Sequence, residues 1–480
     1  MTLKNNIDKK IWAVHSGKTS GSKESTNAKH NRLAILTWKE KLAYGFGDAG
    51  FNFYWALIGG YLAAFYTDTL GLAAATAGTL IAATKIIDAF TDPIMGAIAD
   101  RTNSRYGKFR PYLLYAGVPM AIVSVLAFTT PDLSYNGKVI WAFCTYSLMM
   151  IFYTILSTPY SSLSGVMTSH IQERNVLISV RFICAFGASA LIGLFTPKLI
   201  DALGKSDAQL GWQLTVGLYG ILATLIFLVT FAFTKERVIS APKHNPPPIE
   251  DIKDLLKNRP WLVLFALAII LMMTITLRGG SSFYYFKYYV AREDLIGPYL
   301  FWQSIALGAG CCLTPWLTKY IDKKRLLMYL MGIVAGLSLL YYFVPKDMIW
   351  AMFTLNILIS LALGPKSPLT WSMYADTADY NEWKTGRRAT AMTFAAATFS
   401  QKLGGALGSA GMLWLLAYIG YSANQAQNSA SLSGINFLQT AAPGVFALIA
   451  VAVVLFYGLD NKRLEQIQND LAKRHQGFDK

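Results

Sequence analysis

The sequence predicts an all-α polytopic membrane protein with twelve transmembrane helices in two six-helix bundles. Its 480 residues are 54% apolar and only 15% charged, and the mean hydropathy is +0.37, whereas soluble domains carry about 25% charged residues. Apolar stretches of about 20 residues, each long enough to cross a bilayer, recur from residue 43 to residue 458. A charged, proline-rich segment, Lys235–Pro248, separates the first six stretches from the last six.

Short connections join the predicted spans everywhere except in the middle of the chain. The spans are 43–66, 75–99, 111–130, 139–165, 176–200, 213–234, 261–289, 298–318, 326–344, 348–374, 389–419 and 436–458. They imply a disordered tail at 1–37, a first bundle at 38–236, a linker at 237–260, a second bundle at 261–460 and a C-terminal tail at 461–480. Two bundles around a long connection are typical of secondary transporters, and one such chain is expected to function as a monomer.

Basic residues are distributed unevenly between the two sides of the membrane. If both termini lie on one side, that side holds 32 of the 43 Lys and Arg residues and the other side holds five. The positive-inside rule then places both termini in the cytoplasm. The net charge of +16 therefore reflects the positive-inside bias of a membrane protein. It argues against a nucleic-acid partner, which would require a basic footprint on a folded surface.

The apolar stretches contain no pattern typical of an enzyme or of a metal cofactor. The four cysteines lack metal or disulfide spacing, and the five histidines lie in hydrophilic segments. We therefore expect no enzymatic activity and no cofactor. A receptor that signals without transport is also disfavoured, because neither tail can form a folded cytoplasmic domain.

Two carboxylates in the second span are the most informative feature of the chain. Asp88 and Asp92 lie one helical turn apart, so their side chains share one helix face. A carboxylate inside a membrane is costly, and it is retained where it meets a cation or a proton in the protein interior. Since two close carboxylates cannot both ionise cheaply, H⁺ and Na⁺ are expected to compete for one site. The pair predicts a cation-coupled carrier; the alternative is a structural ion-pair network with Lys85.

Several motifs resemble those of one transporter family. The loop with Asp100, Arg101 and Arg105 resembles the signature loop of the major facilitator superfamily. Similarity to the glycoside–pentoside–hexuronide:cation symporters, the group that contains melibiose permease, is carried by Asp88-Ala-Phe-Thr-Asp92-Pro-Ile-Met-Gly, Tyr153-Thr-Ile-Leu-Ser-Thr-Pro159, Ala375–Trp383 and Lys402-Leu-Gly-Gly405. The resemblance implies the major facilitator fold, a place in the plasma (inner) membrane, and alternating-access import of a glycoside with Na⁺ or H⁺.

The resemblance also implies where the coupling ion binds. The family's cation site corresponds to Asp88, Thr91, Asp92 and Thr154, and a family lysine beside this site corresponds to Lys402. Melibiose permease has an amide at the position of Thr91. A hydroxyl can still bind Na⁺, but the loss of the amide leaves the choice between Na⁺ and H⁺ open.

The expected sugar site departs from that of the galactoside carriers. Where those relatives have two carboxylates, this chain has Asn52 and Ser157, while Lys366 stands between two prolines that should break the tenth span near mid-membrane. Compared with the galactoside carriers, the expected sugar site has less negative and more positive charge. We therefore predict an acidic sugar as substrate, such as a hexuronide or an oligouronide. The expected sugar-site residues, whose aromatic members would stack on the rings, are Asn52, Tyr153, Ser157, Arg181, Arg278, Lys287, Lys366 and Trp371.

Charged residues near the cytoplasmic ends of the spans are expected to form a gate. They are Asp100, Arg101, Arg105, Asp376, Asp379 and Glu382. We expect the last three to pair with the basic loop 105–110 in one conformation. Some alternatives stay open: Arg278 as a structural residue, Lys287 as a side chain reaching the membrane surface, a neutral pentoside or xyloside as substrate, and a lysolipid as a more distant substrate.

Overall fold

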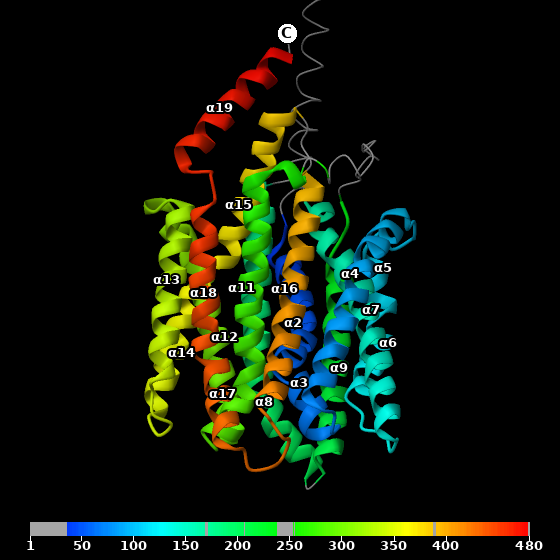
Figure 1. Cartoon of the computed structure of the whole chain (residues 1–480). Coiled ribbons are helices and arrows are strands. Elements are labelled where there is room, and N and C mark those ends of the chain that lie inside the picture. Colours follow the sequence, from blue (N-terminus) through cyan, green and yellow to red (C-terminus); the bar gives the residue numbers. More distant parts are fainter. Residues whose placement is uncertain are drawn as a thin grey trace, which may run out of the picture.

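The computed structural model describes residues 36–168, 171–205, 207–237, 253, 255–386 and 390–478, and these ranges contain helices but no strand. Most helices stand side by side along one direction (Figure 1). We call the end that carries Leu36 and α19 (Asn461–Phe478) the terminal end, and the other the opposite end. The predicted tail and linker lie largely outside the described residues, at 1–35, 238–252 and 254.

The first half of the molecule contains the helices up to residue 233. They are α2 (Trp38–Gly60), α3 (Leu62–Ala64) with the π-helical turn η1 (Phe65–Thr69), α4 (Ala74–Arg101), α5 (Arg110–Tyr115), α6 (Gly117–Ala127), α7 (Tyr135–Met167), α8 (Ile171–Gly204) and α9 (Ala208–Phe233). The first helix begins at Trp38 because Thr37 caps it: the Thr37 hydroxyl accepts from the Glu40 backbone, and the Glu40 side chain accepts from the Thr37 backbone.

The second half contains the helices from residue 259 to residue 455. They are α11 (Arg259–Tyr284) with the π-helical turn η2 (Tyr285–Tyr289), η3 (Glu293–Leu295), α12 (Ile296–Tyr320), α13 (Lys323–Tyr342), α14 (Ile349–Leu363), α15 (Lys366–Thr385), α16 (Thr390–Tyr418), α17 (Ser429–Gln439) and α18 (Ala441–Leu455). Each predicted span thus coincides with one helix or with consecutive helices that meet at a short break.

Length and hydropathy alone identify seven membrane spans among the described residues, or eight if α17 and α18 form one. Helices α2, α4 and α16 are also long enough to cross a bilayer. Their sequences contain Asp48, Asp88 and Lys402 within the apolar run. Three helices that this criterion leaves out therefore carry charged residues of the candidate site.

The tenth predicted span is interrupted at the first of its two prolines, but it still runs as one span, Ile349–Thr385. Helix α14 ends at Leu363 and α15 begins at Lys366, which leaves Gly364 and Pro365 between them. An added Cβ at Gly364 would lie 2.4 Å from the carbonyl oxygen of Leu307 in α12. Because a side chain there would displace α12, the glycine allows α12 to pack closely against this part of the span. Lys366, the first residue of α15, lies in the interior of the second half.

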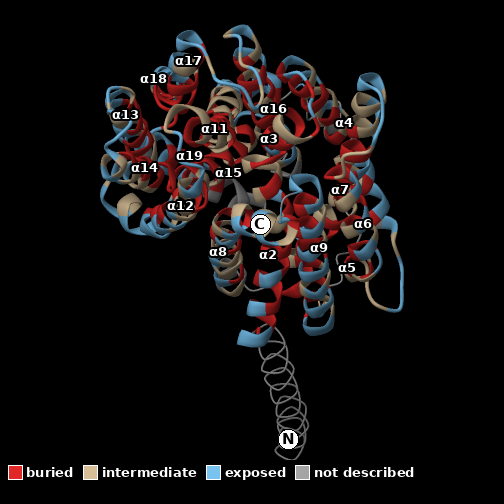
Figure 2. Cartoon of the chain, turned by 90° about the horizontal axis from the view of Figure 1, so that it is seen from below, coloured by how far each residue is buried: buried red, intermediate tan, exposed pale blue. Residues whose placement is uncertain are grey.

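The two halves pack against each other through α4 with α16, α8 with α12, and α2 with α11. Seen along the helices, they form two groups whose buried residues lie where helices face one another (Figure 2). Near the opposite end, an added Cβ at Gly297 of α12 would lie 2.7 Å from the carbonyl oxygen of Leu194 in α8. The halves are therefore joined tightly at the opposite end.

A helix that the sequence analysis did not predict lies in the C-terminal tail. Leu464, Ile467 and Leu471 form the buried face of α19. The Trp383 indole of α15 donates a hydrogen bond to Asp470 over 3.1 Å. The tail therefore packs on the terminal end of α15.

Candidate functional site

Asp88 and Asp92 form the centre of the candidate cation site. Helix α4 presents both carboxylates to α7 and α16. The Thr154 hydroxyl of α7 lies 3.0 Å from Asp88 Oδ1 and 3.1 Å from Asp92 Oδ1. Lys402 of α16 pairs with both carboxylates, with its Nζ 3.0 Å from Asp88 Oδ2. The Asp88 side chain is fully buried and that of Asp92 is 27% exposed, so Asp92 is the more accessible side of the pair.

This ion pair joins the two halves of the molecule. The carboxylates belong to the first half and Lys402 to the second. Its ammonium contacts Asp88 Oδ2 and Asp92 Oδ2, which are also oxygens that a bound cation would use. A cation bound at these two carboxylates would therefore have to compete with Lys402 for them.

Thr91 and Lys85 lie beside the pair but bond elsewhere. The Thr91 hydroxyl donates to the Asp88 carbonyl of its own helix over 2.9 Å. The Lys85 ammonium lies 5.2 Å from the centre of the Trp55 ring and 4.0 Å from Met150 Sδ. The structure thus brings four of the five predicted cation-site residues together and leaves Thr91 at the edge. Lys402, rather than Lys85, is the lysine that pairs with the carboxylates.

In the first half, Arg181 is the centre of the predicted sugar-site residues. Its Nε lies 3.0 Å from Asp48 Oδ1, and its guanidinium lies over the Tyr160 ring at 5.3 Å. Asn52 donates to the Asp48 carbonyl over 2.8 Å and accepts from the Ser189 hydroxyl over 3.0 Å. Asp48 thus ties Arg181 and Asn52 together, as expected for a structural partner of a buried cation.

Tyr153 and Ser157 lie one turn apart on α7, which also carries Thr154. Both side chains are half-buried, and the Tyr153 ring packs edge-on against Phe51 with centroids 5.6 Å apart. A sugar held by these residues would therefore lie close to the cation site on the same helix.

In the second half, Lys366 and Trp371 lie on the first turns of α15. The Lys366 side chain is buried; its ammonium lies 3.6 Å from Met272 Sδ, and no carboxylate among the described residues pairs with it. Trp371 stacks on Phe394 with centroids 5.5 Å apart. The start of α15 therefore combines the charge of Lys366, which no carboxylate among the described residues pairs with, with the rings of Trp371 and Phe394.

Two predicted sugar-site residues lie elsewhere in the structure. Arg278 is buried among the helices of the second half and donates to Asn356 Oδ1 over 2.6 Å and to Ser360 over 3.4 Å. Lys287 lies in η2 and pairs with Asp68 over 2.7 Å at the opposite end. The structure therefore favours the structural alternative for Arg278. It places Lys287 at the end of its span, paired with Asp68.

Replacing Arg278 by Met is expected to destabilise the protein without changing which sugar it prefers. The change removes the donors to Asn356 and Ser360, and a buried polar group left without its partner costs about 1–3 kcal/mol. Thermal unfolding of the detergent-solubilised protein checks the loss, and uptake competition between sugars checks the preference. A variant of normal stability with an altered preference would return Arg278 to the sugar site.

Two parts of the predicted gate, Asp376 and the backbone of the loop 105–110, bond within their own halves. Asp376 pairs with Lys323 of α13 over 2.7 Å. In the loop 105–110, the backbone N–H groups of Lys108, Phe109 and Arg110 donate to the Glu236 carboxylate over 2.8–3.0 Å. The pairing of α15 with this loop stays a prediction for another conformation.

The remaining gate positions are as follows in the structure. Arg101 and Arg105 are exposed, and the Arg105 guanidinium lies over the Tyr106 ring at 4.6 Å. Asp379 and Glu382 follow Asp376 on α15. Asp100 lies in the last turn of α4, the helix that carries Asp92, and its side chain lies outside the described residues.

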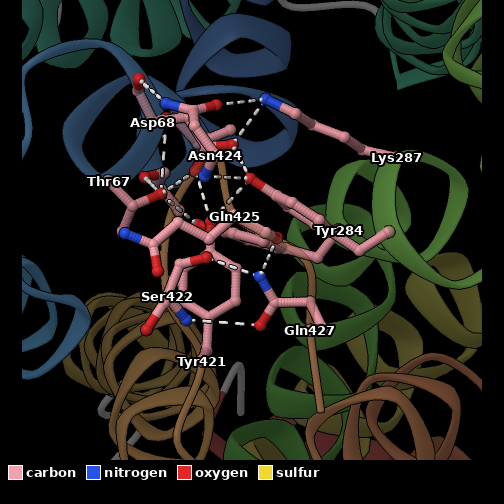
Figure 3. A network of polar contacts seen from close by, with 12 residues as sticks. Thr67, Asp68, Tyr284, Lys287, Tyr421, Ser422, Asn424, Gln425 and Gln427 are labelled. Atoms are coloured by element: carbon pink, nitrogen blue, oxygen red, sulfur yellow. Dashed lines mark hydrogen bonds and ion pairs between the residues drawn. The ribbon is translucent and has the colours of Figure 1, made fainter.

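A polar network at the opposite end was not predicted from the sequence. Asp68 of η1 lies beside Tyr421, Asn424 and Lys287 (Figure 3). Asp68 follows the first predicted span, 43–66, by two residues, so its position at the end of an apolar stretch could be read from the sequence. Its partners are far away in the chain, so the signal did not identify them.

With this geometry established, comparisons with known proteins identify the family. A family described as MFS/sugar transport protein matches residues 43–461, which is most of the chain. The chain belongs to this family. Membership in the MFS/sugar transport family confirms the predicted polytopic α-helical fold and the predicted role as a sugar symporter, and the members are transporters rather than enzymes.

Curated relatives of this family member cover nearly its whole length. It is 35% identical over 441 residues to the inner membrane symporter YicJ of Escherichia coli, with 92% of this chain and 96% of that protein covered. It is 33% identical to the isoprimeverose transporter of Lactiplantibacillus pentosus, with 96% of each chain covered. The glucuronide carrier protein homolog of Escherichia coli is 28% identical, with 92% of this chain and 96% of that protein covered.

Solved structures support the fold of this family member. The crystal structure of a D-xylose–proton symporter superimposes with a TM-score of 0.63, and 88% of this chain and 97% of that chain are covered. The sequence identity of 15% is low. The likeness therefore concerns the fold alone.

Proposed function

We propose that the protein imports an acidic sugar together with Na⁺ or H⁺, and that the cation replaces Lys402 at Asp88 and Asp92. The contact of Lys402 with both carboxylates carries this proposal, since it joins the two halves through the atoms that would bind the ion. A cation at the pair would release Lys402 and loosen α4 from α16. The halves would then be free to rock around a site at mid-membrane, as in alternating access.

The charge balance of the spans supports an acidic substrate. Among the described residues of the site, Lys85, Arg181, Lys366 and Lys402 stand against Asp48, Asp88 and Asp92, which leaves one excess positive charge. No carboxylate among the described residues pairs with Lys366, so its ammonium can attract an anionic group. A sugar carboxylate at Lys366 would form a charge-assisted hydrogen bond, and Trp371 and Phe394 would offer faces to the ring.

A neutral pentoside is the second candidate substrate. Asp48 and Arg181 neutralise each other, and Asn52 and Ser157 are uncharged, so the first half alone offers no excess charge. One relative is named a glucuronide carrier homolog and another an isoprimeverose transporter, so relatives carry names of both substrate kinds.

The distribution of basic residues supports an orientation with the terminal end in the cytoplasm. The predicted cytoplasmic side holds 32 of the 43 Lys and Arg residues. In that orientation the tight contact of Gly297 with α8 lies near the external end. We propose that the conformation described here faces the cytoplasm.

Uptake into proteoliposomes tests the proposed function. Methyl β-D-glucuronide and methyl β-D-glucoside form a matched pair, because they differ only in a carboxylate at C6. Each is offered under an inward Na⁺ gradient and then under an inward H⁺ gradient. Accumulation of the glucuronide above that of the glucoside under one gradient is expected. Equal or greater accumulation of the glucoside would contradict the acidic substrate. Accumulation that changes with neither gradient would contradict coupling to Na⁺ or H⁺.

Replacing Lys402 by Met is expected to strengthen cation binding by about 5–150-fold, the range of coupling factors between linked sites. The change removes the competing ammonium and leaves two carboxylates close together. Thermal stability as a function of Na⁺ and of pH gives the apparent affinity. Lys85→Met is the matched control, since Lys85 forms no bond to the pair. If Lys402→Met and Lys85→Met change the apparent cation affinity equally, the proposed competition between Lys402 and the cation is contradicted.

A further inference from the structure

Asp68 connects the two halves at the opposite end through bonds to both of its carboxylate oxygens. Its Oδ2 accepts from Lys287 Nζ over 2.7 Å and from the Tyr288 hydroxyl over 2.5 Å. Its Oδ1 accepts from the Tyr421 hydroxyl over 2.5 Å. All three donors belong to the second half, whereas Asp68 belongs to the first. One carboxylate therefore accepts three hydrogen bonds across the interface between the halves.

Asn424 reinforces the same junction. Its side-chain amide donates to the Asp68 backbone carbonyl over 2.7 Å and accepts from Lys287 over 2.8 Å. Its backbone N–H donates to the Tyr288 hydroxyl over 2.9 Å. The residue has a φ of 56°, a left-handed conformation that asparagine tolerates better than most residues. Asn424 is thus held in an uncommon conformation in which it bonds both sides of the junction (Figure 3).

The junction is formed by equivalent elements of the two halves. The first span of each half ends in a five-residue π-helical turn: η1, which contains Asp68, and η2, which contains Lys287 and Tyr288. Each turn is closed by a backbone bond five residues long, from Leu70 to Phe65 over 2.8 Å and from Val290 to Tyr285 over 2.9 Å. Isolated π-helical turns are rare and occur frequently at functional sites.

The junction is shielded from solvent on one side and open on the other. The Asp68 side chain is 5% exposed and that of Lys287 is 18% exposed. A hollow of about 490 Å³ lies against it, lined by Asp68, Tyr135, Tyr421 and Asn424 among others. A solute that enters this hollow from the opposite end therefore meets the bonds around Asp68.

We propose that Asp68 is the gate residue that holds the opposite end closed, and that η1 and η2 separate when this end opens. Opening must break the three bonds to the carboxylate together, because one residue accepts all of them. Water in the adjacent hollow can then solvate the separated charges. This inference requires only that the two halves move, so it does not depend on the acidic substrate or on the choice of cation.

Distance measurements between spin labels test the gate. The labels are attached at Ala75→Cys in α4 and Ala430→Cys in α17, both exposed positions at the opposite end, in full-length protein whose four native cysteines are replaced by alanine. Asp68→Asn is expected to raise the population of long distances about 10-fold or more, because it removes the charge that strengthens all three bonds. Tyr421→Phe, which removes one donor, is expected to raise it to a smaller extent.

Asp132→Asn is the matched control, because it removes one exposed carboxylate at the same end without touching the gate. It is expected to leave the distances unchanged. Exchanging the charges in the double variant Asp68→Lys with Lys287→Asp is expected to restore part of the closed population. Distances in both Asp68→Asn and Tyr421→Phe that match those of the unsubstituted protein would overturn the proposal. If Asp68→Asn does not elute as a monodisperse protein, Tyr421→Phe alone decides.

Discussion

Replacing Asp88 by Asn is expected to abolish cation-driven accumulation of sugar while the protein stays folded. Asparagine has the shape of aspartate, and Lys402 keeps its partner Asp92. The site then holds one carboxylate and one ammonium, which neutralise each other and leave no net negative charge for a cation. Loss of the coupling should lower the accumulation ratio by the factor that the gradient supplies in the unsubstituted protein, which leaves equilibration only. Uptake into proteoliposomes under the effective gradient measures this factor.

Thr91→Val is the comparison for Asp88→Asn. The Thr91 hydroxyl bonds to the backbone of its own helix, so its removal is expected to change accumulation little. Exchange of internal for external sugar without a gradient shows whether Asp88→Asn still binds and moves sugar. Gradient-driven accumulation that survives in Asp88→Asn would exclude this carboxylate from the cation site.

Replacing Lys366 by Met is expected to weaken glucuronide binding by about 10–150-fold, the equivalent of a charge-assisted hydrogen bond of about 1.5–3 kcal/mol. Glucoside binding should change little, since a neutral sugar does not use the charge. The ratio of the two affinities, measured by competition, reports the effect and cancels any change in the amount of active protein.

The same substitution is expected to raise the melting temperature of the sugar-free protein. A buried ammonium without a carboxylate partner is costly, and Met fills a similar volume without the charge. Lower stability together with an unchanged glucuronide-to-glucoside ratio would instead make Lys366 a structural residue. These two readouts separate a binding role from a folding role.

Local patterns in the sequence account for the features that were predicted well. Apolar length predicted the helices, and Pro365 and Pro368 predicted the break before Lys366. The spacing of Asp88 and Asp92 predicted a shared helix face, and the resemblance to a known family added Thr154 and Lys402. Each of these inferences needed only neighbouring residues or a motif.

The features that were missed depend on contacts between distant residues. Asp68 bonds to Lys287 and Tyr421, which follow it by 219 and 353 residues, and no local pattern connects them. Arg278 was assigned to the sugar site because a cation in a span is costly, but the sequence could not reveal that Asn356 is its partner. The spacing of Leu464, Ile467 and Leu471 is typical of a helix with one buried face. The helix α19 could therefore have been predicted from local sequence, but it was not.

The coupling between cation and sugar is tested most directly by equilibrium binding in both directions. Isothermal titration of methyl β-D-glucuronide into the solubilised protein, with and without the coupling cation, gives one affinity ratio, and titration of the cation with and without the sugar gives the other. Because coupling is reciprocal, the two ratios should be equal and should lie in the range of about 5–150. In Asp88→Asn the ratio of glucuronide affinities should fall to one. Glucuronide binding that is the same with and without Na⁺, and the same at low and high pH, would contradict a cation site at Asp88 and Asp92 that controls sugar binding.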